Sequence, residues 1–600
     1  MSTATARSYR SNSAGRFMPS GSRKNLEIKP FYGRRSTSFA QAHCIKDSVL
    51  LDPAAGFGNF LTETYLSLRR LENDILRETI TDSSGTGILG FDGDEFNPIK
   101  VSIQQFYGIE INDFAVAVAK TAIWIAEAQM FKETEAIIHK EMDFLPLHNN
   151  ANIHEGNSLN MDWAEIINSN VLSYIMGNPP FVGAKKKMNK QQKFEMVALF
   201  NKNSSAKSLD YVAAWYKKAA EYMKGTKIHA AFVSTNSITQ GEQVPILWEG
   251  LIKEGIVINF AYKSFIWNSE ANLKAHVHCV IVGFSYEELK NKLLYSDQSC
   301  KPCAHINAYL AELPDIFVKR RTKPLCNVPE LILGNKTYDD GNLILSEEEK
   351  DEIIAKEPIT KSWIRPFLGA YEFINRKSRY VIWLKDVSPA EINQSKIVKE
   401  RISNVYNFRR KSTDAGTRKG AEYPSLLLNI TQKDIDYNNF IFVPRVSSER
   451  RRYVPMGFLP STVMISDAGY FMPYADLCTF GVLNSNVHMA WMRTVAGRLE
   501  MRYRYSNFIV YNNFPWPQLN ENQKKKIEQT AQMILDAREL YPDCSLADLY
   551  DAVLMPKELR EAHRANDRAV MKAYGFDISM TEEDCVTELL KLYSDFSKNN

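Results

Sequence analysis

The sequence has little cysteine, little excess charge and no long apolar run. Eight cysteines scattered over 600 residues do not form a disulfide framework and indicate a reducing cytoplasm. No window approaches about 18 uninterrupted apolar residues, so no membrane span is predicted. The net charge of +4 is too small to indicate a nucleic-acid partner by itself. With 44% hydrophobic and 24% charged residues, the composition is typical of a soluble globular protein. A chain of this length is expected to form about two to four domains.

Metal ligands and a regular N-terminal segment are also lacking. Cys300 and Cys303 form a lone CxxC without a second pair nearby, so free thiols are expected and no metal site is predicted. Residues 1–45 are Ser/Gly-rich and basic, with Glu27 as their one acidic residue, and are predicted to be a disordered arm. The arm is interpreted as a plain tail or as a contact to phosphates. Its composition also resembles a transit peptide, but no amphipathic helix supports that.

A strand followed by a glycine turn begins the first domain. The apolar run of residues 48–51 predicts a buried strand, and apolar residues at helical spacing predict a helix from about Leu61. Between them, Gly56 and Gly58 permit a tight turn and the close approach of a ligand. This arrangement is typical of the first βα unit of a nucleotide-binding sheet. The candidate ligand-binding residues of this turn are Asp52, Ala54, Gly56, Gly58 and Asn59.

Two further strands end in polar side chains. Glu110 follows the strand that begins at Phe106, and a carboxylate there can accept hydrogen bonds from both hydroxyls of a ribose. Asn157 ends the third strand and is a candidate contact to a nucleobase. Together with four more apolar runs and the helices between them, these strands predict a seven-stranded, doubly wound, Rossmann-like sheet over residues 46–285. Residues 81–104 are predicted to be a surface insertion, and Phe265 and Trp267 to lie in a loop.

The most informative motif follows the fourth strand. An apolar run over residues 171–177 leads to Asn178, Pro179, Pro180 and Phe181. Loops at the carboxyl ends of parallel strands are where open α/β sheets carry their chemistry. The Asn178 oxygen and the Pro179 carbonyl can accept the two hydrogens of an exocyclic amine, and the Phe181 ring can stack on the attached base. The alternative is a plain strand end followed by a proline turn.

The second half of the chain changes character. Residues 286–340 are interpreted as a connecting region. Residues 341–515 carry short aromatic and β-branched runs, and predict a mixed α/β domain. Residues 516–600 are charged and helical in pattern. Interleaved Arg and Tyr suit phosphates and base edges, and the candidate nucleic-acid-binding residues are Arg445, Arg450, Arg451, Arg452, Arg502 and Arg504.

The three motifs together resemble those of amino-methylating DNA methyltransferases, in the order cofactor motif, catalytic motif, recognition region. The motifs are residues 52–60, Gly108-Ile109-Glu110 and 178–181. Four further stretches resemble the MmeI-like (type IIL) restriction-modification enzymes, from about residue 47 to the end. These stretches are residues 61–73, 269–278, 444–453 and 502–507.

The resemblance implies methyl transfer from S-adenosylmethionine to N6 of a flipped adenine at a specific site in double-stranded DNA. It implies that Asp52, Gly56 and Gly58 shape the cofactor loop, that Glu110 holds the ribose and that Asn157 lies beside the cofactor's adenine. Asn178, Pro179 and Phe181 would hold the target base. Family members usually carry Cys and Ser where this chain has Ala55 and Phe57, and an N-terminal nuclease with an Asp and Glu-x-Lys site. No Asp occurs in residues 1–26, so no nuclease is expected in this chain, and whether a separate nuclease is a partner stays open.

Three alternatives are weighed against this function. A cytosine-C5 enzyme needs a nucleophilic Cys in a Pro-Cys loop, and Pro302-Cys303 lies far from any strand-end motif. Enzymes that methylate protein glutamine or RNA also use Asn-Pro-Pro loops, but do not need a large Arg/Tyr-rich domain. A catalytically inactive DNA-binding remnant, with its cofactor loop damaged at Ala55 and Phe57, stays open, and cofactor binding separates it from a working enzyme.

Overall fold

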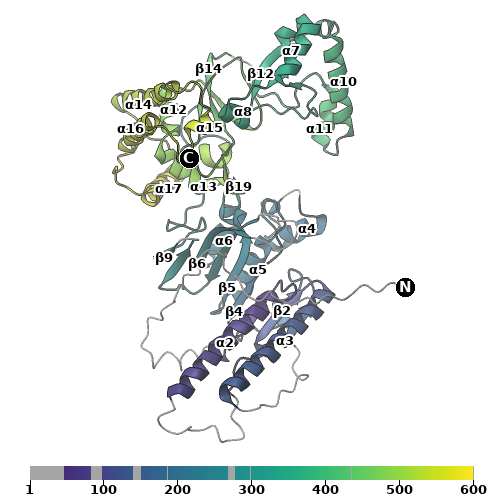
Figure 1. The fold of residues 1–600 in the computed structure, drawn as a ribbon, viewed down its shortest axis with the longest axis vertical. Coiled ribbons are helices and arrows are strands. Elements are labelled where there is room, and N and C mark those ends of the chain that lie inside the picture. The colour runs from purple at the N-terminus through teal and green to yellow at the C-terminus, as the bar shows by residue number, and fades with distance from the viewer. Residues whose placement is uncertain are drawn as a thin grey trace, which may run out of the picture.

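The computed structural model describes residues 46–82, 98–139, 151–184, 187–267, 277–296, 299–433 and 436–598. The predicted basic arm (1–45), most of the predicted insertion and most of the family-like stretch 269–278 lie outside these residues. Three parts follow one another along the chain, and we refer to them as the sheet domain (46–303), the middle domain (304–515) and the helical domain (516–598). Figure 1 shows the sheet domain at the bottom and the other two parts above it.

A nine-stranded sheet forms the sheet domain, in the order β3-β2-β1-β4-β5-β7-β6-β8-β9. Strands β1 to β5 are parallel, and β7 runs antiparallel between β5 and β6. The chain switches direction across the sheet between β1 and β4, which is where open α/β sheets bind ligands. All seven predicted strands form, so the predicted fold class is confirmed. The strands are β1 (Leu50–Asp52), β2 (Phe106–Glu110), β3 (Asn152–Glu155), β4 (Tyr174–Gly177), β5 (His229–Thr235), β6 (Val257–Trp267), β7 (Val277–Ser285), β8 (Lys292–Tyr295) and β9 (Cys300–Cys303).

Two details of the sheet differ from the prediction. Strands β8 and β9 lie in the predicted connecting region and extend the sheet beyond β6. Each is four residues long, which is too short to show a clear period in the sequence. Phe265 and Trp267 are not in a loop but belong to β6 and pair with β7. A register shift between Tyr262 and Phe265 interrupts the alternation of this strand, so the pattern ends early.

Helices cover both faces of the sheet. Leu50 packs in a core with residues of α2 and α3, whereas Leu51, next along β1, packs in a core with α5 and α6. By length and composition α3 is apolar enough to cross a membrane. Its buried residues nevertheless recur every three or four positions and face the sheet, as in the core helix of an α/β domain. The helices are α2 (Asn59–Asp82), α3 (Asp113–Ile138), α4 (Lys190–Leu199), α5 (Ala213–Met223) and α6 (Gln243–Lys253).

The middle domain contains three small sheets among the described residues. Two have four strands, in the orders β10-β18-β14-β16 and β11-β13-β12-β17, and the third has the order β15-β20-β19. The strands are β10 (Ile332–Leu333), β11 (Ile344–Leu345), β12 (Ile364–Leu368), β13 (Tyr380–Ile382), β14 (Asn439–Pro444), β15 (Val446–Ser447), β16 (Gly457–Pro460), β17 (Met464–Ile465), β18 (Gly469–Pro473), β19 (Gly497–Leu499) and β20 (Arg502–Arg504). The helices are α7 (Glu347–Lys356), α8 (Ala370–Asn375), α9 (Pro389–Ile392), α10 (Lys396–Lys411), α11 (Ala415–Lys419), α12 (Leu477–Leu483) and α13 (Asn486–Val495).

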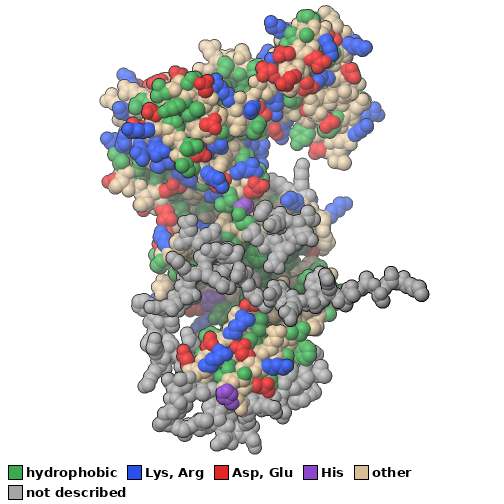
Figure 2. All heavy atoms as spheres, in the orientation of Figure 1, with side chains coloured by type: hydrophobic (Ala, Val, Ile, Leu, Met, Phe, Trp, Pro, Cys, Tyr) green, Lys and Arg blue, Asp and Glu red, His purple; other side chains and the backbone are tan. Residues whose placement is uncertain are grey.

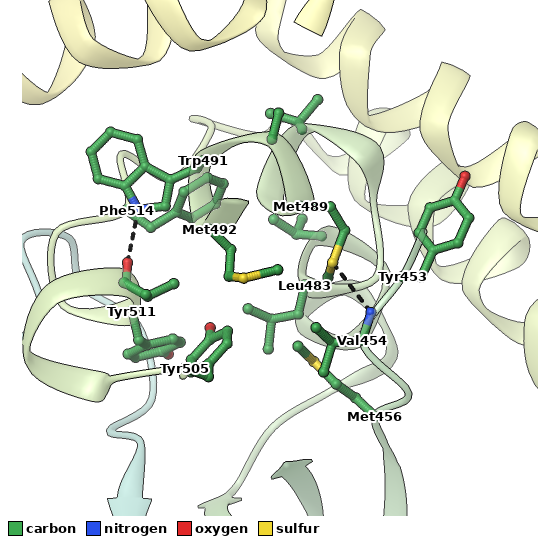
Figure 3. Packing of buried hydrophobic residues seen from close by; sticks show 14 of the residues in the cluster. Tyr453, Val454, Met456, Leu483, Met489, Trp491, Met492, Tyr505, Tyr511 and Phe514 are labelled. Atoms are coloured by element: carbon green, nitrogen blue, oxygen red, sulfur yellow. Dashed lines mark hydrogen bonds between the residues drawn. The ribbon is translucent and has the colours of Figure 1, made fainter. Parts of the chain in front are cut away.

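One hydrophobic core joins the middle domain to the helical domain. Trp491 of α13, Tyr511 and Ile527 of α14 are all buried in it, and Figure 3 shows Trp491 and Tyr511 close together within this core. The indole N–H of Trp491 donates to the carbonyl oxygen of Val510 (2.9 Å). The helical domain therefore packs on the middle domain without a separate core. Its helices are α14 (Glu521–Glu539), α15 (Leu546–Leu549), α16 (Lys557–Tyr574) and α17 (Glu582–Lys598).

Candidate functional site

The turn between β1 and α2 depends on two glycines. Gly56 has φ +54° and Gly58 has φ +80°, a backbone region that favours glycine. A Cβ atom on Gly58 would lie 2.8 Å from the Cβ of Ala119, so this glycine lets the turn pack against α3. Apart from its chain neighbours Ala55 and Phe57, no atom of the described residues lies within 4 Å of a Cβ atom placed on Gly56. Gly56 therefore borders open space that a ligand can enter.

Glu110 lies beside this turn at the end of β2. Its Oε2 accepts the N–H of Gly56 (2.9 Å), and its Oε1 accepts the N–H of Asn112 (3.0 Å). A carboxylate has about four acceptor positions, so each oxygen can still accept from a ligand hydroxyl. Asn59, the first residue of α2, is exposed at the same edge of the sheet. The predicted cofactor residues of the first two strands are thus brought together.

Asp52 connects the β1 turn to the end of β4. It is 1% exposed, and its Oδ1 accepts the N–H of Ala54 (3.0 Å). Burial, opposed by this hydrogen bond and assisted by the charge of Glu110, raises the pKa of Asp52 to about 7. A Cβ atom on Gly177 would overlap Oδ1 of Asp52. The carboxyl group therefore packs directly against the residue that precedes Asn178.

The Asn178–Phe181 loop follows β4 at the switch point of the sheet. Pro179 is buried, Pro180 is exposed and Phe181 is half-buried. The side-chain oxygen of Asn178 is buried, and no donor within the described residues reaches it. Leaving a buried acceptor unpaired costs about 1–3 kcal/mol. A ligand amine that donated to this oxygen would remove that cost.

Asp210, which the sequence interpretation missed, holds the segment after this loop. Its Oδ1 accepts the N–H of Ala184 (3.1 Å) and the side-chain amide of Gln243 (3.2 Å). Its Oδ2 accepts the hydroxyl of Thr235 at the end of β5 (2.5 Å). The N–H of Tyr211 donates to the carbonyl oxygen of Val182 (2.9 Å). The sequence places this acid among apolar residues just before α5, and no local pattern shows that three separate segments meet there.

Trp215 of α5 ties the same region to the β1 turn. Its indole N–H donates to the carbonyl oxygen of Pro53 (3.0 Å), and its ring meets the Tyr211 ring edge to face, with centroids 5.3 Å apart. Residues 210–215 therefore contact both the glycine turn and the loop after Asn178. These contacts fix the two loops relative to each other.

Asn157 lies in a hydrogen-bonded network around a buried carboxylate. Its side-chain amide donates to Oε1 of Glu195 on α4 (3.0 Å), and its oxygen accepts the N–H of Leu159 (3.0 Å). Glu195 also accepts from the Gln191 amide (3.0 Å) and from the Tyr211 hydroxyl (2.5 Å). The structure thus places Asn157 against α4, and its role beside an adenine stays a prediction.

Three of the predicted DNA-binding residues come together around the β15-β20-β19 sheet. Arg502 and Arg504 are exposed on β20, and Arg504 pairs with Val446 of β15. Arg445 precedes β15, and its carbonyl oxygen accepts the N–H of Tyr505 (2.9 Å). Residues separated by more than 50 positions in the sequence therefore form one small basic surface.

The other three predicted residues lie elsewhere. Arg450, Arg451 and Arg452 follow β15 and line a cavity of about 380 Å³ against α13, α16 and α17. Arg450 and Arg452 are exposed, and burial lowers the pKa of Arg451. The candidate DNA-binding residues thus divide into two groups, one on the β15-β20-β19 sheet and one facing the helical domain.

The β19–β20 hairpin rests on the sheet domain. A Cβ atom on Gly241 would lie 3.1 Å from the backbone nitrogen of Gly497, the first residue of β19. Glu242, next along the chain, forms an ion pair with Arg320 (3.4 Å), whose guanidinium lies 3.8 Å from the centre of the Phe508 ring. Figure 1 shows β19 at the boundary between the two parts, near α6. The turn at Gly241 and Glu242 is therefore in contact with the middle domain. It directly precedes Gln243, whose side-chain amide donates to Asp210.

Comparison with known proteins matches all three parts of the chain. Residues 37–296 match the DNA-methyltransferase domain of MmeI, residues 312–518 its target recognition domain and residues 519–599 its C-terminal domain. The DNA methyltransferase A of Bacillus subtilis (strain 168) is 41% identical over 551 residues, which are 91% of this chain and 61% of that protein. The chain thus spans about three fifths of the length of this curated relative.

A solved structure matches the whole arrangement. The type IIL restriction-modification enzyme MmeI in complex with DNA is 40% identical, with a TM-score of 0.87 over 94% of this chain and 75% of that one. The agreement covers the sheet, middle and helical domains together. The chain belongs to the MmeI family of type IIL restriction-modification proteins.

Proposed function

We propose that the protein transfers a methyl group from S-adenosylmethionine to N6 of adenine at a specific site in double-stranded DNA. The observation that carries this function is the buried, unpartnered side-chain oxygen of Asn178 at the switch point of the sheet. An adenine amine supplies the donor that this oxygen lacks. The open space at Gly56 and the free acceptor capacity of Glu110 fit the cofactor.

S-adenosylmethionine, when bound, supplies an electrophilic methyl group on a sulfonium. The residues of this chain orient the amine that receives it. Asn178 accepts one N–H through its side-chain oxygen, the carbonyl of Pro179 accepts the other, and the Phe181 ring stacks on the flipped base. The lone pair of an adenine amine is delocalised into the ring. Two acceptors for its N–H groups favour a more tetrahedral nitrogen, whose lone pair is less delocalised and more nucleophilic. The cost of flipping is a few kcal/mol, offset by stacking and by DNA contacts.

Two features bear on the alternatives. The Phe57 side chain is 54% exposed, so its ring is not packed into the core beneath the glycine turn. This supports a working cofactor site over an inactive DNA-binding remnant. Cys303, the thiol of the Pro-Cys dipeptide, lies on β9 at the far edge of the sheet from β1 and β4. A cytosine-C5 mechanism through this thiol therefore has no support.

The test combines cofactor binding with replacement of Asn178. We expect the purified protein to bind S-adenosylmethionine in calorimetry. We also expect Asn178→Ala to abolish methyl transfer to DNA while retaining cofactor and DNA binding. Asn170→Ala, an exposed asparagine before β4, is the matched control and should transfer normally. Absence of cofactor binding in the folded protein favours the inactive remnant, and normal transfer by Asn178→Ala contradicts the assignment.

A separate nuclease is the second proposed partner, and the cytoplasm is the proposed location. Mapping of methylated adenines in genomic DNA identifies the recognised site. Purification of the chain from its source tests for a bound nuclease.

A further inference from the structure

A strongly basic surface lies where the middle domain meets the helical domain. We call it the arginine surface and define it by five exposed side chains, Arg450, Arg452, Arg560, Arg564 and Arg568. Figure 2 shows Lys and Arg side chains gathered over the helical domain, at the upper left. The surface is separate from the Asn178 loop, and three of its five members lie in a domain to which the sequence assigned no function.

The α16 part of the surface is a stripe of like charge. Arg560, Arg564 and Arg568 recur at four-residue spacing, which places them on one face of the helix. Like charges at this spacing repel each other and destabilise a helix. No ion pair to Arg564 or Arg568 occurs among the described residues. A stripe that weakens its own helix and is not neutralised by the protein is suited to an anionic partner.

Two adjoining cavities connect α16 with the loop after β15. The smaller, of about 280 Å³, is lined by Arg452, Arg560 and Arg564, and its acidic residue is Asp551. The Asp551 carboxylate accepts the N–H groups of Val553 (2.9 Å) and Leu554 (3.0 Å), so it is engaged in its own turn. The larger cavity, of about 380 Å³, also contains Arg452 in its wall. The acidic residues of the larger cavity are Glu582, which is paired with Arg493, and Glu449, which lies 4.0 Å from Arg450. The two cavities share Arg452, and the arginines that line them outnumber the acidic residues.

Side-chain contacts hold the loop after β15 against helix α16. The hydroxyl of Tyr453 donates to Oδ2 of Asp567 on α16 (2.6 Å), and its ring stacks on His563 with centroids 4.0 Å apart. The guanidinium of Arg452 lies 5.6 Å from the centre of the same Tyr453 ring. Figure 3 shows Tyr453 at the side of the shared core. The backbone segments that carry Arg452 and the α16 arginines are therefore already fixed relative to each other before a ligand binds, which lowers the cost of binding.

The chain connects the arginine surface to the β15-β20-β19 sheet. Strand β15 pairs with β20, where Arg502 and Arg504 are exposed, and Arg450 follows β15 after two residues. Phosphates of one strand of duplex DNA recur every few ångströms, so a duplex that contacts the sheet can extend over this loop. We propose that the helical domain binds backbone phosphates of duplex DNA flanking the recognised site, through Arg452, Arg560, Arg564 and Arg568. This inference rests on the proposed DNA methylation.

Duplex length separates flanking contacts from contacts to the site itself. The test variant is Arg564→Gln with Arg568→Gln in the full chain. The control is Lys591→Gln with Lys598→Gln, because these lysines of α17 are paired with Glu588 and Asp595 and removing them changes the net charge equally. The probes are duplexes of about one and about three helical turns that carry the mapped methylation site centrally. Affinity is measured at several salt concentrations, and folding is checked by thermal unfolding.

We expect the test variant to bind the long duplex about tenfold more weakly, with a salt dependence reduced by up to about two units in the log–log slope. Binding of the short duplex and methyl transfer at saturating DNA should be unchanged, and the control variant should resemble the native protein. An unaltered affinity and slope on the long duplex overturns the proposal. The proposal is also overturned if the variant loses an affinity for inorganic phosphate but keeps its affinity for DNA, because the arginines would then form a small-anion site. Failure of methyl transfer in the native protein refutes the proposed function, and the duplex-length comparison is then made on duplexes of mixed sequence, where a tighter binding of the long duplex that the test variant loses still supports the phosphate contacts.

Discussion

Replacement of Asp210 tests whether the position of the Asn178 loop depends on a residue outside it. Asp210→Ala removes the acceptor for the N–H of Ala184, the Gln243 amide and the Thr235 hydroxyl. Asp210→Asn is the conservative partner, because an amide oxygen can still accept from Ala184 and Gln243, and the Thr235 hydroxyl can turn to accept from the amide N–H. Asp210→Asn keeps the volume of the native side chain, Asp210→Ala removes its carboxyl group, and both variants leave Asn178 intact.

The expected magnitude follows from these bonds. A hydrogen bond to a charged group contributes about 1.5–3 kcal/mol, and Ala184 lies three residues beyond Phe181. If that energy holds the loop in its productive position, its loss lowers the productive population by about 10- to 100-fold. We therefore expect kcat of Asp210→Ala to fall by about that factor, with KM for DNA and for the cofactor changed much less. Asp210→Asn should recover most of the loss.

The assay is single-turnover methyl transfer at saturating cofactor and DNA, with both dissociation constants measured separately. A native rate in Asp210→Ala refutes the reasoning, because the loop would then not need this anchor. A parallel loss of cofactor binding in both variants also refutes it, because Asp210 would then support the fold of the whole domain. Gln243→Ala, which removes one of the three donors, should give an intermediate rate.

Two further predictions concern Asp52 and Gly177, the residue of β4 that packs against it. The pKa of Asp52 rises from 3.8 to about 7 on folding, so its contribution to stability is fully present below about pH 4 and is lost as pH rises through 7. The free energy of unfolding of the Asp52→Asn variant, relative to that of the native protein, should therefore rise by up to about 4 kcal/mol between pH 4 and pH 7.5. A difference between the two proteins that does not change with pH would contradict the burial argument. Gly177→Ala should destabilise the sheet domain by about 1–3 kcal/mol and weaken cofactor binding, because its Cβ overlaps Asp52. Gly250→Ala, at an exposed position of α6 with open space around it, should stabilise the protein slightly, and equal effects of the two would refute the packing argument.

Local pattern was sufficient to predict most of the sheet domain. Buried strands and amphipathic helices have short periods, so the seven strands and the helices between them could be read without any contact information. The glycine turn after β1 and the Asn178 loop after β4 could be located because each directly follows a strand. Parallel strands present their carboxyl ends at one edge, which is why Asp52, Glu110 and Asn178 could be expected to lie near one another.

Contacts between distant segments were decided by the tertiary structure alone. Asp210 meets Ala184 and Gln243, which are 26 and 33 residues away, and no local period encodes such a meeting. The grouping of Arg445 with Arg502 and Arg504, and of Arg452 with α16, depends on sheet pairing and on a core shared by two domains. The sequence by itself therefore determined the fold class and the strand-end motifs, because they follow from local periodicity. Only the packed structure determined which charged side chains share a surface, because that depends on long-range contacts.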